Sequence, residues 1–396
     1  MASSAEIHSD RRIPSLTGLR IFAALAVYLS HIGAPHNSPT LVATFFNSGY
    51  SGVTLFFVLS GFVLALNYTD EFRPMRLRST YNFFVGRFAR IYPVYIAVLL
   101  FIVVQYHATG VSIDGWWRNG LAIQAWWPDL AVAYSFDAPA WSLSVEFFLY
   151  ACFPLLIPLL GRLRRPRTLL ITAAAIAAAM LALAAIFVIT GDSALPREDP
   201  SSAHRWLYRT PLTRLGDFAL GIVAAQLFFA TRGNGLLPRV GGKIAAGAAA
   251  VFIAVMAWPA MFSSAWSWDV AYAIPAVVLI FALAVAPRSL PARFLSLPAL
   301  VLLGEASYAF YLVHQPAITY FGGGGWMLNA APTLVLNEIF VLAAILALAI
   351  GVHTGLERPA RRYLRRWLSW GSPRRRQTQA PAAAPAASSA SAEAAP

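Results

Sequence analysis

The sequence predicts an all-α membrane protein, a bundle of about ten transmembrane helices. Hydrophobic residues make up 58% of its 396 residues and charged residues only 12%, whereas a soluble domain has about 25% charged residues. Long apolar runs recur along the chain, each close to the roughly 20 residues that a helix needs to cross the hydrocarbon core. The single cysteine, Cys152, excludes an intrachain disulfide scaffold.

Ten apolar segments, taken in chain order, are predicted to be the spanning helices. Each is about 17–25 residues long, enough to cover ~30 Å at 1.5 Å per residue. The first is not expected to be a cleaved signal peptide, because it contains Arg20 and His31 and lacks a small-residue cleavage site. The segments are 15–34, 45–67, 82–104, 141–160, 169–190, 212–230, 244–262, 267–287, 299–320 and 332–354.

The loops between these segments predict the orientation. Of the 30 Lys and Arg residues, 24 fall on one side of the predicted spans, which by the positive-inside rule is the cytoplasmic side. We therefore expect a multi-pass protein of the cell membrane with both termini in the cytoplasm. The net charge of +13 is then an orientation signal, and no nucleic-acid partner is expected.

The chain divides into three parts on this basis. Residues 1–14 form a cytoplasmic N-terminal segment, and residues 15–365 form the transmembrane domain. Residues 366–396 form a tail that is basic at first and then rich in Ala, Pro and Ser. Because the tail has few large apolar groups, we expect it to be disordered.

Two pairs of ionisable residues lie at helical spacing within the spans, where each charge costs at least ~2.5–3.5 kcal/mol on insertion scales. Arg20 and His31 are eleven residues apart, so they share a helix face and lie about 16 Å apart along the axis. Arg87 and Arg90 share a face at the cytoplasmic start of the third span, where paired guanidiniums suit phosphate groups. The alternatives are a snorkelling Arg with an interfacial His, and topology or lipid-contact charges.

A second group of polar residues is predicted to gather in the outer half of the bundle. Glu146 opens the fourth span, His314 lies near the outer end of the ninth, and Arg214 and Asp217 open the sixth. Together with His31 they contain a histidine and a carboxylate, the minimum for a general base with an orienting partner. Arg20 or Arg214 could stabilise an oxyanion. The alternative is a buried polar network that fixes helix packing.

Five motifs in order over residues 14–365 resemble those of the acyltransferase-3 family of membrane O-acyltransferases. In particular, the Leu-Thr-Gly-Leu-Arg form of the first motif is similar to the actinobacterial branch, which includes macrolide antibiotic acyltransferases. The motifs run from Ser15 to Arg20 with His31, from Gly52 to Phe62, from Arg87 to Pro93, from Trp141 to Glu146, and from Leu303 to Pro316.

The resemblance implies ten core helices and transfer of an acyl group from acyl-CoA, as co-substrate, to a hydroxyl of a macrolide or a cell-envelope glycan. It implies His31 as the base with Arg20 on the same helix, and Arg87 and Arg90 near the donor. No metal and no bound cofactor are expected. The candidate site residues are His31, Glu146, Arg20 and His314 as catalytic groups, and Arg87, Arg90, Ser60, Arg214, Trp141, Ser142 and Tyr308 as substrate or donor contacts.

Two departures and one alternative qualify this interpretation. The family usually has Asp where Thr17 and Thr54 stand here, so we expect Glu146 to carry more of the carboxylate's role. The alternative class is a secondary transporter that exports a small molecule, which would predict repeated halves with interrupted helices. The two halves of this sequence show no convincing repeat.

Overall fold

The protein is a helical bundle in which a helix matches each of the ten predicted spans. The computed structural model describes residues 12–327 and 332–370, and these ranges contain helices and loops but no strand. The fold class is therefore confirmed. The ten helices are α2 (Pro14–Ile32), α4 (Ser51–Tyr68), α5 (Leu77–Ala108), α8 (Trp141–Leu160), α9 (Pro166–Ile189), α10 (Leu215–Ala230), α11 (Leu237–Ala257), α12 (Val270–Val285), α14 (Pro298–Phe321) and α15 (Pro332–Val352).

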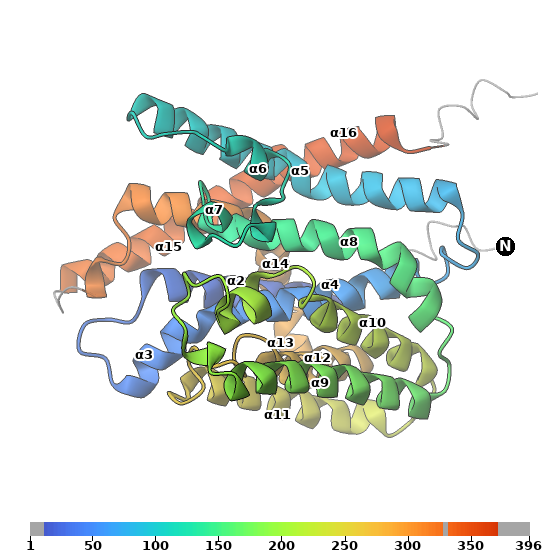
Figure 1. Cartoon of the computed structure of the whole chain (residues 1–396). Helices are drawn as coiled ribbons and strands as arrows, with labels where there is room; N and C mark the ends of the chain where they lie inside the picture. The colour runs from blue at the N-terminus through green and yellow to red at the C-terminus, as the bar shows by residue number, and fades with distance from the viewer. Residues whose placement is uncertain (1–11, 328–331, 371–396) are drawn as a thin grey trace, which may run out of the picture.

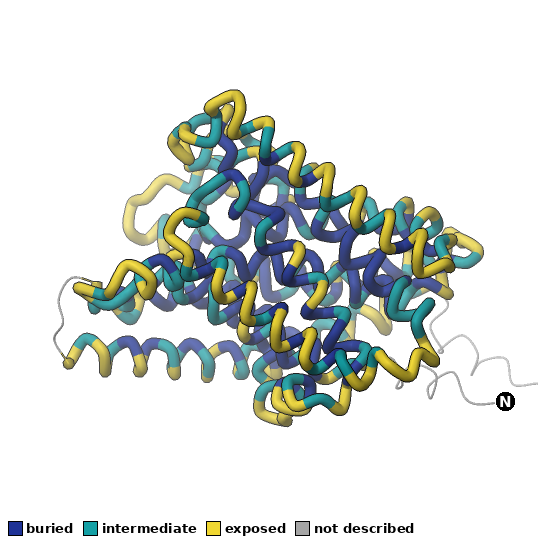
Figure 2. The backbone as a smooth tube through the Cα atoms, turned by 90° about the horizontal axis from the view of Figure 1, so that it is seen from below, coloured by how far each residue is buried: buried dark blue, intermediate teal, exposed yellow. Residues whose placement is uncertain are grey.

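Length and composition agree with a membrane bundle. Seven helical segments of the described residues are long and apolar enough to cross a bilayer, and α10 and α12 are shorter apolar helices. The residues of α4 are mostly buried, whereas α9 buries few of its own. Figure 2 shows this division, with buried backbone inside the bundle and exposed backbone along its outer helices. Exposed large apolar side chains such as Leu170 and Ile189 would be a liability in water but suit a lipid-facing surface.

Several boundaries differ from those predicted. The predicted second span, 45–67, is broken into α3 (Thr40–Asn47), the short helix η1 (Ser48–Tyr50) and α4. The seventh span begins at Leu237 rather than 244, because Pro238 occupies the first turn, where its missing N–H is not needed. After α15 the chain continues through a π-helical turn, η7 (His353–Glu357), into α16 (Arg358–Leu368), so the boundary predicted at 365/366 falls inside a helix. Residues 1–11 of the predicted N-terminal segment and residues 371–396 of the predicted tail lie outside the described residues.

The helices pack around α4 (Figure 1). It contacts α2, α10 and α12, while α2 also packs on α14 and α14 on α15. A Cβ on Gly61 of α4 would collide with the carbonyl oxygen of Phe218, and one on Gly221 of α10 with that of Val58. Small residues that let backbones approach closely are how helices associate in lipid. The close contact of α4 and α10 therefore depends on these two glycines.

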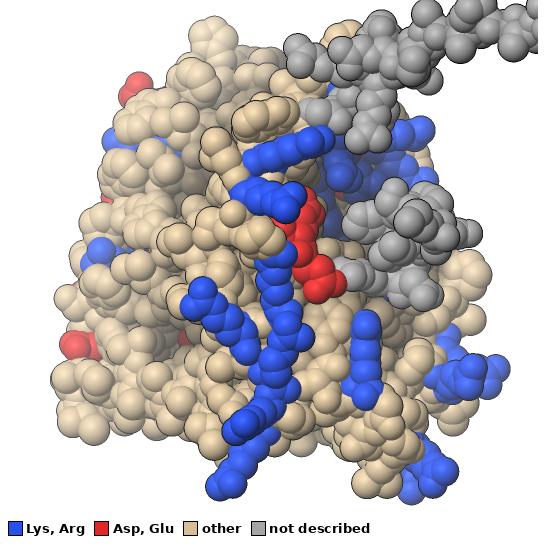
Figure 3. Space-filling model, turned by 90° about the vertical axis from the view of Figure 1, so that its right-hand side faces the viewer, with Lys and Arg blue, Asp and Glu red and all other residues tan. Residues whose placement is uncertain are grey.

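One end of the bundle is strongly basic. Figure 3 shows Lys and Arg side chains spread over this end, with acidic side chains near its middle. Arg12, just before α2, and Arg358, Arg361 and Arg362 of α16 line one cavity there. The described chain therefore begins and ends on the same side of the bundle, as an even number of crossings requires.

Candidate active site

Three cavities follow one another through the bundle, and the first opens at the basic end. We call it the vestibule. It has about 1430 Å³ of space free of protein atoms, part of it solvent at its open mouth. Six arginines line it, against two carboxylates: Glu305 is paired with Arg358, and Glu357 lies 2.7 Å from Nδ1 of His353. The arginines are Arg12, Arg20, Arg90, Arg358, Arg361 and Arg362. The vestibule thus carries a clear excess of positive charge.

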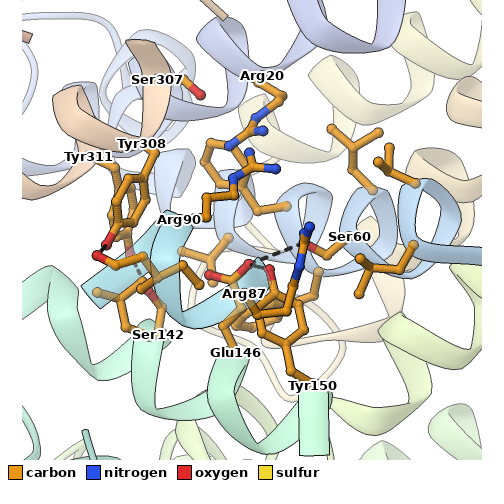
Figure 4. A pocket seen from close by; sticks show the side chains of 18 residues that line it. Arg20, Ser60, Arg87, Arg90, Ser142, Glu146, Tyr150, Ser307, Tyr308 and Tyr311 are labelled. Carbon is orange, nitrogen blue, oxygen red and sulfur yellow. Dashed lines mark hydrogen bonds between the residues drawn. The ribbon is translucent and has the colours of Figure 1, made fainter. Parts of the chain in front are cut away.

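The second is the central cavity of Figure 4, with about 790 Å³ of empty space. It shares Arg20 and Arg90 with the vestibule, so the two cavities adjoin at these side chains. Arg20 comes from α2 and Arg90 from α5, and both point into the same space. The Nε atom of Arg20 is buried without a hydrogen-bond partner. A buried donor left unsatisfied is costly, which makes it available to a ligand.

Glu146 faces these arginines across the central cavity. Its carboxylate accepts hydrogen bonds from Ser60 of α4, at 3.3 Å, and from Tyr150 one turn further along α8. Arg87 donates to the hydroxyl of Tyr68 at 3.3 Å, and its guanidinium lies 5.9 Å from the centre of the Tyr150 ring. The spacing of Glu146 and Tyr150 by four residues places them on one helix face, so the sequence alone carries a signal that associates the two.

The remaining wall of the central cavity is fixed by hydroxyl groups. Ser142 and Tyr311 share a hydrogen bond of 2.8 Å, and the Tyr311 hydroxyl also donates to the carbonyl of Pro139 at 3.0 Å. Tyr308 donates to the carbonyl of Ile91 at 2.7 Å. The ring of Tyr311 also lines the third cavity. These bonds hold α8 and α14 in place beside the cavity.

The third cavity, the outer chamber, contains His31. It has about 880 Å³ of empty space and shares Val53 and Tyr311 with the central cavity. Besides His31, seven of its fifteen lining residues are aromatic: Tyr50, Tyr134, Trp141, His204, Tyr208, Trp268 and Tyr311. Burial, together with the charges of Arg197 and Arg209, lowers the pKa of His204 to about 3, so this ring is neutral. Flat apolar faces with few charges suit a sugar ring or another ring-containing ligand.

His31 and His314 form a pair at the edge of this chamber. Nδ1 of His31 lies 2.8 Å from the carbonyl oxygen of Val27, and Nδ1 of His314 lies 2.7 Å from that of Tyr311. A carbonyl oxygen only accepts, so each Nδ1 carries a proton. Nε2 of His314 then faces Nδ1 of His31 as an acceptor at 3.4 Å. This tautomer, inferred from the hydrogen bonds, leaves Nε2 of His31 with a free lone pair, as a base requires.

Arg214 lies apart from the cavities. Its guanidinium is fully buried, and it donates to Asp217 at 2.9 Å and to Asp269 at 3.0 Å. It also donates to Thr54 at 3.1 Å, one of the two positions where the sequence departs from the family pattern. These bonds tie α10 to α4 and to the start of α12. Arg214 is not among the residues that line the three cavities.

The structure thus separates the predicted site residues into groups. Arg20, Ser60, Arg87, Arg90, Ser142, Glu146 and Tyr308 line the central cavity, and His31 and Trp141 line the outer chamber. Of the two partners predicted for His31, His314 lies beside it, while Glu146 lies in the other cavity. Tyr150, Tyr311 and Arg361 were not among the site residues predicted from the sequence. The first two lie on the helix faces of predicted site residues, whereas Arg361 was counted as a topology charge.

Comparison with known proteins agrees with this arrangement of motifs. A family model described as an acyltransferase domain, that of the acyltransferase-3 family, matches residues 13–354, most of the chain. This chain belongs to the acyltransferase-3 family. It is 35% identical to acyltransferase MdmB of Streptomyces mycarofaciens over 90% of this chain and 93% of that protein. The resemblance inferred from the five motifs is therefore confirmed, and the chain is a multi-pass membrane acyltransferase of this family.

Other relatives are longer than this chain. O-acetyltransferase OatA of Staphylococcus aureus is 27% identical over 86% of this chain and 56% of that protein. Peptidoglycan O-acetyltransferase OatA of Listeria monocytogenes is 24% identical over 86% of this chain and 54% of that protein. The chain therefore spans about half the length of these relatives. No solved structure matches it.

Proposed function

We propose that this protein transfers an acyl group from acyl-CoA to a hydroxyl of a sugar-containing acceptor, a macrolide or a cell-envelope glycan, with His31 as the general base. One observation carries the proposal: a strongly basic cavity, a central cavity and a chamber containing His31 adjoin in that order. A donor with a phosphorylated head and a reactive far end fits this order, with its head held by arginines and its thioester near the histidine.

The donor half of the proposal rests on charge and length. Guanidiniums bind phosphate oxygens bidentately, and Arg12, Arg90, Arg361 and Arg362 offer several in the vestibule. Arg20 and His31 are eleven residues apart on α2, a helical rise of about 16 Å. An extended pantetheine arm is of this order, so the head could stay in the vestibule while the thioester reaches the outer chamber.

The reaction step needs one proton transfer in each direction. Nε2 of His31 takes the proton from the acceptor hydroxyl, and the oxygen attacks the thioester carbonyl. The carbon–sulfur bond breaks, and the departing thiolate takes the proton from His31, giving the ester and free CoA. His314 accepts from Nδ1 of His31 throughout, and a hydrogen bond from a charged imidazolium is stronger than one from the neutral ring. Arg20, whose Nε has no hydrogen-bond partner, would instead hold a polar group of the donor where the vestibule meets the central cavity.

Glu146 has a supporting role in this scheme. Held by Ser60 and Tyr150, it supplies negative charge on the wall opposite Arg87 and Arg90 and so limits the repulsion between the buried guanidiniums. Ser142 and Tyr308 would shape the channel for the pantetheine arm. Trp141 would contribute a ring face to the acceptor.

The acceptor half rests on the outer chamber and on the relatives. Two relatives are O-acetyltransferases, one of them acting on peptidoglycan by its name. We propose that the basic end faces the cytoplasm, where acyl-CoA is made, and that both termini lie there in the cell membrane. The outer chamber would then receive the acceptor from the opposite half of the bilayer.

The first experiment is transfer of a labelled acetyl group from acetyl-CoA by purified protein in nanodiscs. His31→Ala should lower the rate by about 10²–10⁴-fold, the usual contribution of a general base. Arg90→Gln should raise the KM for acetyl-CoA and leave the acceptor KM nearly unchanged. Full activity of His31→Ala would refute the base assignment, and an unchanged donor KM in Arg90→Gln would refute the donor path.

A second experiment identifies the acceptor. Mass spectrometry of secreted metabolites and of envelope glycans, with and without the gene, should show a product heavier by one acyl group. Transport of a small molecule without any dependence on acyl-CoA would instead support the exporter alternative.

The same histidine could also carry the acyl group as an acyl-imidazole between donor and acceptor. Rapid quenching of the protein with labelled acetyl-CoA in the absence of acceptor decides this point. Label bound to His31 supports a relay, and the absence of bound label supports direct transfer.

A further inference from the structure

A fourth cavity at the basic end lies outside the acyltransfer path. We call it the arginine pocket. It has about 830 Å³ of empty space, and its residues come from the ends of α4, α8 and α10 and the turns that follow them. Its lining is Thr69, Asp70, Arg73, Leu163, Arg164, Gln226, Phe229, Ala230 and Arg232. It shares none of these residues with the vestibule, the central cavity or the outer chamber.

Three arginines from three separate turns meet in this pocket. Arg73 follows α4, Arg164 follows α8 and Arg232 follows α10. Asp70 is the only acidic residue that lines the pocket, so the pocket carries a net charge of about two positive units. Burial and the neighbouring charge of Arg164 lower the pKa of Arg73, because the two guanidiniums are close enough to repel each other.

The packing of two arginines fixes them against neighbouring groups. The guanidinium of Arg73 lies over Gly161 at the end of α8, where an added Cβ would come within 3.2 Å of it. Arg232 lies 5.1 Å from the ring centre of Phe228 and 4.8 Å from that of Phe229. Aromatic faces hold a guanidinium while leaving its N–H groups free for another partner.

The inner wall of the pocket is polar as well. Gln226 of α10 and Thr69 are both almost fully buried, and the side-chain amide of Gln226 donates to the Thr69 hydroxyl at 2.8 Å. An amide inside an apolar helix bundle is costly. Charges near helix ends commonly serve topology or offset the helix dipole. Those roles explain positive residues in the turns, but they require neither a shared cavity nor a buried amide behind it.

We propose that the arginine pocket binds a phosphate ester, with Arg73, Arg164 and Arg232 as its ligands and Gln226 in its inner wall. The pocket lies at the ends of spanning helices, the depth of lipid headgroups. Basic pockets between membrane helices bind anionic headgroups there. An anionic phospholipid and a soluble phosphate compound offer the same chemistry, and the experiment separates the two sources.

The test measures lipid retention by native mass spectrometry of the purified protein. The triple variant Arg73→Gln, Arg164→Gln, Arg232→Gln is compared with Arg167→Gln, a matched control whose exposed side chain does not line the pocket. The purified proteins are first incubated with vesicles that contain phosphatidylglycerol. We then expect the triple variant to bind this lipid roughly 100-fold more weakly and the control to show little change. Equal retention in both would overturn the proposal.

A second arm uses inorganic phosphate with delipidated protein. Binding of phosphate that requires the three arginines, without selective retention of phosphatidylglycerol, supports the pocket with a soluble ligand. If the triple variant still binds both phosphatidylglycerol and phosphate, the proposal is overturned. If the triple variant unfolds, the single change Arg164→Gln, at an exposed side chain, should still weaken binding by about fivefold.

Discussion

At the scale of single residues, the pairing of His31 with His314 decides which ring nitrogen can act as a base. Backbone carbonyls fix both Nδ1 protons, so His314 offers its Nε2 lone pair to the ring of His31. Within the proposed mechanism, His314 is a positioning residue, since it lines none of the three cavities and acts through His31.

His314→Leu should therefore lower kcat by roughly tenfold to a hundredfold, the cost of about 1 Å of misplacement, while the KM for the donor stays nearly constant. His314→Gln retains an amide that can accept from Nδ1, so it should recover part of the lost rate. Steady-state kinetics with acetyl-CoA measure both values. Equal loss in the Leu and Gln variants would mean that His314 only fills space.

At the scale of elements, α16 forms one wall of the vestibule. In the sequence its arginines were counted only as orientation charges. The π-helical turn η7 connects α15 to α16, and α16 packs on α5. This contact brings Arg361 into the vestibule beside Arg90. The C-terminal helix thus contributes to the proposed donor site as well as to topology.

Arg361→Gln should raise the KM for acetyl-CoA by roughly fivefold to tenfold. A charge-assisted hydrogen bond contributes about 1.5–3 kcal/mol, and it contributes less where solvent reaches the site. The matched control is Arg366→Gln on the same helix, whose exposed side chain does not line the vestibule. Isothermal titration with CoA gives the same comparison without turnover. A similar change in both variants would point to general attraction of anions rather than to a specific contact.

Helices α10 and α12 are joined by a buried charge cluster. Arg214 lies between Asp217 and Asp269, and its removal would leave two buried carboxylates without their cation. Breaking a buried ion pair from one side costs about 3–5 kcal/mol.

We therefore expect Arg214→Gln to lower the thermal unfolding temperature strongly, with activity lost together with the folded protein. Thermal unfolding in detergent, followed by tryptophan fluorescence, measures this loss. A folded, stable Arg214→Gln protein with no activity would instead return Arg214 to the substrate-contact role predicted from the sequence.

At the scale of the whole molecule, the outer chamber couples stability to pH. The pKa of His204 is about 3 in the folded protein and about 6.5 when the residue is solvated. The unfolded state thus binds a proton first as the pH falls. The stabilisation associated with neutral His204 is complete above about pH 6.5 and is lost progressively toward pH 3.

The unfolding temperature should accordingly fall between pH 7.5 and pH 5, and His204→Asn should show a smaller fall over the same range. Differential scanning fluorimetry at matched ionic strength provides the measurement. The same pH dependence in the variant and in the parent protein would assign the effect to other groups.

The sequence was sufficient for the fold class, the ten helices and the family. Apolar runs of membrane-spanning length report the bilayer directly, because each span must satisfy its backbone within one helix. Arg20 and His31 could be placed on one face because a single helix carries both. The boundaries around 45–67 and at 365/366 were less accurate, since apolar periodicity does not reveal the break at η1 or the continuation of α15 through the π-helical turn η7 into α16.

Only the tertiary structure decided which polar residues meet. Glu146 and His31 were grouped by depth alone, yet they line different cavities, because rotation of each helix about its axis is set by packing against neighbours. Arg214 and Arg361 also lie in surroundings that differ from those expected, for the same reason. Arg214 is enclosed by Asp217 and Asp269, whereas Arg361 faces the vestibule. The sequence by itself determined how far each residue lies along its own helix, and the packing of different helices determined its partners.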